Sequence, residues 1–291
     1  MEDGVGERVL VTGATGKVGG ALVRLLADAG RDVKAATRRP WAARERLGEL
    51  ADEVVELDYG RAETYDAAVE WADRLFVVAP PFHPRASDHM SSFVDWAVQA
   101  GVEHVVLLTA MGIETRDDLA LRRLERLVEE TGVAWTFLRP NIYMQNFQRG
   151  FLRREIQGEG TFHLPAGDAR ISLVDARDVA EVAARTLSGD RHVGRAYTLT
   201  GPEAVDHHRV AAILGQAAGR DIRYVPTEDD AMCQRLLDLG WPAGHADVVV
   251  EFFHSIRGDE RARVTGDVEE VLEHQPRGLE AFAREYAETW R

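Results

Sequence analysis

Three glycines near the start of the chain, Gly13, Gly16 and Gly19, have a spacing that could hold a phosphate. They belong to the sequence VLVTGATGKVGG, which follows an apolar run and opens an amphipathic helical pattern. A glycine turn between a strand and a helix lets backbone N–H groups approach the pyrophosphate of a dinucleotide. A glycine-rich turn without a ligand is the alternative, and no Walker register passes through Lys17. The predicted cofactor residues of this turn are Gly13, Thr15, Gly16, Lys17, Val18 and Gly19.

The residues after the second predicted strand, 33–37, indicate which dinucleotide would bind. NAD sites usually place an acidic residue there, to accept from the ribose 2′-hydroxyl. This chain instead reads AATRRP, and the guanidinium of Arg38 could pair with a 2′-phosphate. Two solvated arginines before a helix are the alternative. Asp58, just after the third run, could accept from the adenine amino group or be a plain turn residue. The predicted cofactor is NADP(H).

Few polar side chains are placed to move a proton. Thr109, after the fifth run, could bond a substrate oxygen or only satisfy the backbone where the strand ends. Tyr143 could donate to a substrate carbonyl, or could be a packing tyrosine. His83 lies with His89 in the predicted loop PPFHPRASDH, where an imidazole could relay a proton or simply face solvent. Thr109, Tyr143 and His83 are therefore the candidate catalytic residues.

These residues need a scaffold, and the first 140 positions alternate β-rich runs with helical patterns such as 19–30 and 91–101. Near-continuous apolar runs suit strands buried on both faces, so the sequence predicts a Rossmann-like, doubly wound parallel α/β sheet. We expect its strands at 8–12, 33–37, 53–57, 74–79, 104–109 and 134–139.

The texture of the sequence changes after Pro140. We expect a helix over 144–156, a loop over 158–172, a helix over 174–188, strand-like segments at 195–201 and 223–227, and mostly helices beyond. The predicted domains are 1–150, which binds the nucleotide, and 151–291, a smaller, mostly helical substrate lobe that partly returns to the sheet.

Composition limits the class of protein. The formal charge of −14 disfavours nucleic-acid binding, and no apolar run is long enough to span a bilayer. The acidic N-terminus does not have the pattern of a signal peptide, so we expect a cytoplasmic protein. The single cysteine, Cys233, excludes an internal disulfide, and the pair His207–His208 lacks partners at metal-ligand spacing. We therefore expect no metal.

Several segments together resemble the NmrA-like family of atypical short-chain dehydrogenases/reductases. They are TGATGKVGG, TRRP, TFLRPNIYMQNF, ISLVDARDVAEVA, YTLTGPEAV and the tail VTGDVEEVLEHQPRGLEAFAREYA, in this order along nearly the whole chain. The resemblance implies that Ala79, Pro80 and Thr109 flank the cofactor at the strand ends.

The resemblance also shows what this chain lacks. Short-chain reductases use Tyr-x-x-x-Lys, yet neither Lys17 nor Lys34 has a tyrosine four residues before it. Many NmrA-like relatives carry Lys or His four residues before the Glu of the helix after strand five, and that register falls on Leu121, before Glu125. Reduction of a ketone creates a basic alkoxide that needs a positioned proton donor, whereas reduction of a conjugated acceptor needs one much less.

The expected function is therefore an NADPH-dependent reductase that transfers hydride to a conjugated or aromatic small molecule, quinone-like or biosynthetic. The alternatives are a non-catalytic NADP(H) redox sensor and a scaffold recruited for a non-redox step. The expected partners are the substrate and a second copy of the chain in a homodimer. The predicted substrate pocket comprises Pro81, Phe82, Met111, Tyr143, Met144, Asn146, Phe147 and Trp241.

Overall fold

The computed structural model describes residues 7–79, 86–258 and 260–291 of the chain. These residues form two compact units. Unit 1 comprises 7–79, 86–139 and 176–198, and unit 2 comprises 140–175, 199–258 and 260–291. The chain thus leaves unit 1 after Arg139 and returns to it for 176–198, so neither unit is one continuous segment.

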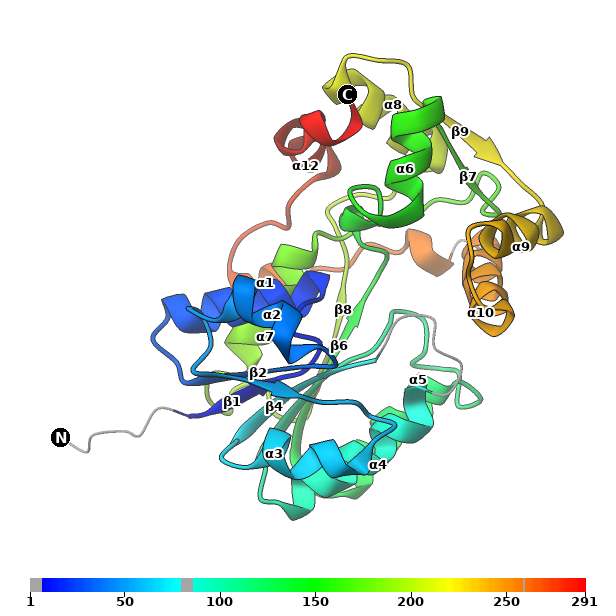
Figure 1. Cartoon of the computed structure of the whole chain (residues 1–291). Coiled ribbons are helices and arrows are strands. Elements are labelled where there is room, and N and C mark those ends of the chain that lie inside the picture. Colours follow the sequence, from blue (N-terminus) through cyan, green and yellow to red (C-terminus); the bar gives the residue numbers. More distant parts are fainter. Residues whose placement is uncertain (1–6, 80–85, 259) are drawn as a thin grey trace. The chain divides into compact units, whose positions relative to one another are not determined.

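Unit 1 is built on a seven-stranded sheet with the order β3-β2-β1-β4-β5-β6-β8 (Figure 1). The pairs β1–β2, β1–β4, β2–β3, β4–β5 and β5–β6 are parallel. This order is that of a Rossmann-like sheet, so the predicted fold class is confirmed. The strands are β1 (Val9–Val11), β2 (Val33–Thr37), β3 (Glu53–Glu56), β4 (Arg74–Val78), β5 (His104–Leu108), β6 (Ala134–Pro140) and β8 (Arg195–Leu199).

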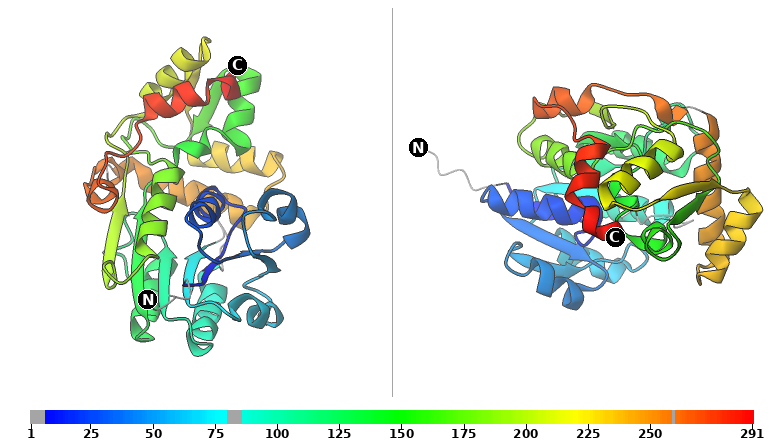
Figure 2. Two further views of the ribbon diagram at one scale, coloured as in Figure 1. Left: turned by 90° about the vertical axis from the view of Figure 1, so that its left-hand side faces the viewer. Right: turned by 90° about the horizontal axis from the view of Figure 1, so that it is seen from above.

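Helices cover both faces of this sheet, which explains why its strands are apolar throughout (Figures 1 and 2). One face carries α1 (Lys17–Asp28) and α7 (Ala176–Thr186), which pack on each other. The other face carries α3 (Tyr65–Val69), α4 (Ala86–Gln99) and α5 (Ala120–Glu130). A short helix, α2 (Pro40–Leu47), follows β2, and a 3₁₀ turn spans Ala62–Thr64.

Unit 2 has its own core around a parallel pair of strands, β7 (Thr161–Leu164) and β9 (Arg223–Pro226), which lie side by side in Figure 2. Around them lie α6 (Gly150–Glu159), α8 (His207–Ala218), α9 (Asp229–Asp238), α10 (Ala243–His254), α11 (Asp267–Leu272) and α12 (Leu279–Glu285). Single 3₁₀ turns occur at Met144–Asn146, Ser255–Gly258, Glu260–Ala262 and Ala287–Trp290.

Two predicted elements of this region were wrong. The segment expected as a loop over 158–172 contains β7, because Phe162 and Leu164 alternate inward and the strand finds its partner in β9. The helix expected over 144–156 is a 3₁₀ turn followed by α6. The Phe147 carbonyl between them accepts a hydrogen bond from Trp290 Nε1 (2.7 Å) instead of continuing a helix.

Candidate functional site

The glycine turn lies at the carboxyl edge of the sheet of unit 1, where β1 meets α1. Gly13 has φ +57°, and a Cβ there would lie 2.5 Å from Val78 Cγ1. A Cβ on Gly19 would lie 2.4 Å from the Gly13 carbonyl oxygen. Side chains at these two positions would therefore push the helix away from the turn and the turn away from β4.

The start of α1 is open to an anion. Gly16 is the N-cap residue, no side chain caps the helix, and Gly13 and Gly16 are exposed. The first N–H groups of a helix have no intrahelical acceptor, and the helix dipole favours negative charge there. Thr15 and Lys17 flank the turn half-buried, whereas Val18 points into the core. The geometry fits a pyrophosphate group.

Backbone hydrogen bonds bring the ends of β2 and β3 to this turn. The Ala14 amide donates to the Ala36 carbonyl (3.3 Å), and the Leu57 amide donates to the Thr37 carbonyl (3.0 Å). Arg38, which follows Thr37 directly, is therefore close to the turn along the same edge.

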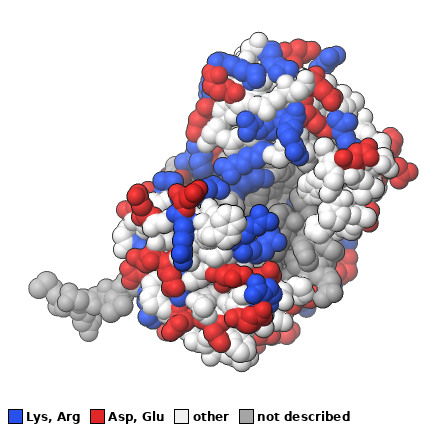
Figure 3. Space-filling view, viewed as in Figure 1, with Lys and Arg blue, Asp and Glu red and all other residues white. Residues whose placement is uncertain are grey.

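Arg38 and Arg39 are both exposed, and neither guanidinium bonds to a described residue. Basic side chains lie over α1 and α2 on the face shown in Figure 3, although the chain as a whole is acidic. Asp58 is half-buried, and its Oδ1 accepts from the Gly60 amide (2.9 Å). The two cations thus remain available to a phosphate ligand, whereas one oxygen of Asp58 is already used in its own turn.

Tyr59, which the sequence analysis did not single out, ties three strand ends together beneath this edge. Its hydroxyl lies 2.8 Å from Thr12 Oγ1 and 3.2 Å from the Val78 carbonyl oxygen. Burial raises the pKa of Tyr59, so the phenol stays protonated and can donate to these acceptors. The only signal in the sequence is an aromatic residue directly after Asp58.

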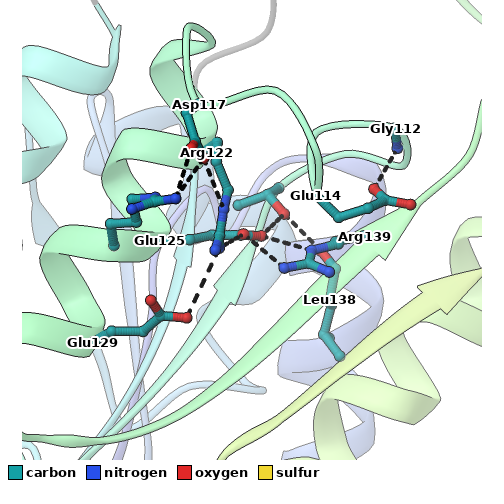
Figure 4. A network of polar contacts seen from close by, with 10 residues as sticks. Gly112, Glu114, Asp117, Arg122, Glu125, Glu129, Leu138 and Arg139 are labelled. Carbon is teal, nitrogen blue, oxygen red and sulfur yellow. Dashed lines mark hydrogen bonds and ion pairs between the residues drawn. The ribbon is translucent and has the colours of Figure 1, made fainter.

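A second polar cluster, the Glu125 network, occupies the carboxyl ends of β5 and β6 (Figure 4). Glu125 in α5 is fully buried. Its Oε1 accepts from Thr109 Oγ1 (2.9 Å) and Arg139 Nε (2.9 Å). Its Oε2 accepts from Arg139 (2.8 Å) and Arg122 (2.7 Å). Four donated bonds saturate the carboxylate and join both strand ends to the helix.

The network fixes what Thr109 can do. Its hydroxyl proton points to Glu125, so the oxygen is left to act as an acceptor. Burial disfavours the charged form of Arg139, but the hydrogen bonds that Arg139 donates to Glu125, and the charge of that carboxylate, outweigh this effect and raise the pKa of Arg139. Leu121, one turn before Glu125, is half-buried and apolar. The signal for Glu125 in the sequence is a glutamate between Leu124 and Val128, on the buried face of a helix.

The remaining candidate residues of unit 2 lie around its core. Tyr143 is half-buried, and its hydroxyl bonds to no described residue. Burial raises the pKa of Tyr143, so it keeps its proton. Met144 and Phe147 are buried in the core of unit 2. Asn146 is half-buried, as is Trp241, which packs edge-on to Phe151.

The loop after β4 is only partly covered by the structure. Pro80, Pro81, Phe82 and His83 lie outside the described residues. Ala79, at the end of β4, is half-buried, and Met111, after β5, is buried. His89 was expected in this loop, and that was wrong: α4 begins at Ala86 and includes it. A Cβ on Gly60 would be 3.4 Å from His89 Nδ1, which puts His89 beside the end of β3.

Among the described residues, no group of three or more His, Cys, Asp or Glu side chains could hold a metal ion. In the same residues, no helix has the length and apolar character that crossing a membrane would require. Burial and the neighbouring Asp247 raise the pKa of Cys233, which disfavours its thiolate.

Comparison with known sequences matches residues 6–283 to the NmrA-like family. An NAD(P)H azoreductase from Xenophilus azovorans is 34% identical over 283 residues, which cover 96% of this chain and 98% of that protein. A (4-alkanoyl-5-oxo-2,5-dihydrofuran-3-yl)methyl phosphate reductase from Streptomyces griseus subsp. griseus is 34% identical over 290 residues, 97% of this chain and 99% of that protein.

Among solved structures, the triphenylmethane reductase of Citrobacter sp. in complex with NADP(H) superposes with a TM-score of 0.80. It shares 22% sequence identity, and the match covers 96% of this chain and 99% of that one. This likeness shows the fold, in agreement with the strand order of unit 1.

Proposed function

Because this chain belongs to the NmrA-like family, we propose that it is an NADPH-dependent reductase that delivers hydride to a conjugated small molecule. One observation carries the cofactor assignment. Two exposed arginines, whose side chains bond to no described residue, follow the strand next to an uncapped, glycine-lined helix start.

Different residues of unit 1 would bind different parts of the cofactor. The turn from Gly13 to Gly19 binds the pyrophosphate through backbone N–H groups, and Arg38 binds the 2′-phosphate. Ala79 and Thr109 flank the cofactor at the ends of β4 and β5, and Pro80 belongs to the same proposal. With its proton held by Glu125, Thr109 accepts a hydrogen bond rather than donating one.

The class of acceptor follows from the available protons. When bound, the reduced nicotinamide supplies a hydride, and the protein must orient the acceptor. Tyr143 is protonated, and no described residue takes its hydrogen bond, so it donates to an acceptor oxygen or nitrogen. The raised pKa makes Tyr143 a poor proton donor, however. This suits acceptors that delocalise the negative charge after hydride addition, because they need a proton donor much less. A saturated ketone would need a stronger acid.

The relatives support this acceptor class. The azoreductase is named for azo compounds, the Streptomyces enzyme for an oxo-dihydrofuran phosphate, and the Citrobacter enzyme for triphenylmethane. The first two names describe unsaturated groups, and the third describes an aromatic compound. The predicted pocket residues Pro81, Phe82 and Met111, which follow the ends of β4 and β5, belong to the same proposal, with His83 as a further proton relay.

The test is NADPH oxidation with a panel of quinones, azo dyes and unsaturated lactones, with saturated ketones of similar size as controls. We expect turnover with at least one conjugated class and at least about 100-fold less with the saturated controls. Tight NADPH binding without oxidation by any acceptor would contradict the proposal and favour the redox-sensor alternative. Sedimentation analysis of the full chain checks the homodimer.

A further inference from the structure

Trp41 is the most exposed large hydrophobic side chain among the described residues. It is 76% exposed, whereas the next in rank reach 44%. The other five tryptophans each have a partner. Trp71 lies under Arg8 and Lys34, Trp96 donates to Asp66, Trp135 stacks on Phe137, Trp241 packs on Phe151, and Trp290 donates to Phe147. The side chain of Trp41 has no hydrogen bond, ring contact or cation–π contact with a described residue.

A single exposed apolar residue needs no explanation by itself, so its position decides the matter. Trp41 is the second residue of α2, after Arg39 at the N-cap and Pro40 at the first position. Proline fixes the backbone at a helix start, so Trp41 is held within one turn of Arg38 and Arg39. The Ala14–Ala36 and Leu57–Thr37 bonds connect this segment to the glycine turn and to Asp58.

The chemistry of these side chains favours a ligand with two parts. Unpaired guanidiniums bind a phosphate without help from an aromatic ring. An indole adds a flat apolar surface on which a purine can stack, and this interaction does not depend on charge. Cations and an aromatic surface in one short segment therefore suit an adenosine that carries a phosphate on its ribose.

We propose that Trp41 is the adenine-stacking residue of this chain and sets its affinity for the adenosine half of the cofactor. The proposal rests on the function proposed above and adds a division of labour. Arg38 binds the 2′-phosphate, and Trp41 stacks on the adenine of either NADP⁺ or NAD⁺.

The experiment measures binding to the full chain by calorimetry, without turnover. The ligands are NADP⁺, NAD⁺, adenosine 2′,5′-bisphosphate and nicotinamide mononucleotide, which lacks adenine. Trp41→Ala should weaken NADP⁺, NAD⁺ and the bisphosphate by about the same factor, roughly tenfold, and leave the mononucleotide unchanged. Trp41→Phe should restore most of the affinity, because it retains an aromatic face. Arg38→Ala should weaken only the two ligands that carry the 2′-phosphate.

A spectroscopic measurement supports the same conclusion by another route. The bisphosphate should quench tryptophan fluorescence in the unaltered protein, and Trp41→Phe should abolish most of that quenching. If Trp41→Ala leaves all affinities unchanged while Arg38→Ala weakens NADP⁺, the stacking proposal is wrong and the cofactor proposal stands. If the unaltered protein binds neither NADP⁺ nor the bisphosphate, both proposals are wrong.

Discussion

Two polar clusters lie along one edge of the same sheet, and they differ in how far their polar groups are hydrogen-bonded within the protein. At the ends of β1 and β2, the helix start is uncapped and Arg38 and Arg39 have no described partner. At the ends of β5 and β6, the buried carboxylate of Glu125 receives four bonds from three side chains. The first cluster leaves polar groups available to a ligand, and the second uses them within the protein.

The difference separates affinity from stability. Exposed groups keep their hydration in the folded protein, so leaving them unpaired costs little, and a ligand can replace water around them. A buried charge without partners would cost several kcal/mol, so Glu125 must be saturated for the strand ends to stay in place. Substitutions in the first cluster should therefore change ligand binding, and those in the second should change unfolding.

The largest effect should come from Glu125→Ala. It leaves the guanidiniums of Arg122 and Arg139, both mostly buried, without their shared partner. We expect a loss of about 3–5 kcal/mol in the free energy of unfolding, measured by urea denaturation. Glu129→Ala is the matched control, because Glu129 is more exposed and lies 3.8 Å from Arg122. It should cost about 1 kcal/mol or less. Equal losses would show that the network is not a structural unit.

A buried histidine at the opposite edge of the sheet, His104, should make the stability of the protein depend on pH. His104 Nδ1 lies 2.7 Å from Arg74 and must accept from it, and its Nε2 lies 3.0 Å from Thr136 Oγ1. Burial, and then the charge of Arg74, lower the pKa of His104 from 6.5 to about 4. Above pH 6.5 both the folded and the unfolded state hold a neutral ring.

As the pH falls from 6.5 toward 4, His104 binds a proton in the unfolded state but stays neutral in the folded state, so the free energy of unfolding decreases. The loss from His104 should reach about 3 kcal/mol near pH 4. His207 in unit 2, whose pKa burial also lowers to about 4, should contribute in the same interval. Denaturation curves at several pH values check this. His104→Gln should reduce the slope between pH 4 and 6.5, and an unchanged slope would contradict the assignment.

In the unpaired cluster, Arg38→Ala should weaken NADPH by about 100-fold and NADH by no more than about twofold. The unfolding midpoint should not change, because Arg38 bonds to no described residue. Arg24→Ala is the control, since Arg24 is also exposed and its side chain bonds to no described residue, but it lies within α1, away from the helix start. A preference for NADPH that survives Arg38→Ala would remove the basis for the 2′-phosphate assignment.

The two clusters also differ in how well the sequence predicted them. The glycine turn and the arginines follow local patterns, because a strand, a turn and a helix adjoin in sequence as well as in space. The Glu125 network joins α5 to the ends of two strands, and no spacing rule links Thr109, Glu125 and Arg139. β7 escaped prediction for a related reason, since its partner β9 lies some 60 residues away and neither strand is long.

The smallest effects compare the two candidate hydroxyls directly. Thr109→Val removes one bond to Glu125, which keeps the three from Arg122 and Arg139, so it should cost about 1 kcal/mol of stability. It should lower kcat by no more than about twofold, because it removes an acceptor beside the cofactor but no proton donor to the substrate. Tyr143→Phe removes a hydroxyl with no described partner, so stability should not change while kcat falls about five- to tenfold. If instead Thr109→Val lowers kcat and Tyr143→Phe lowers stability, the hydrogen bonds within the protein do not distinguish structural residues from substrate-binding residues in this chain.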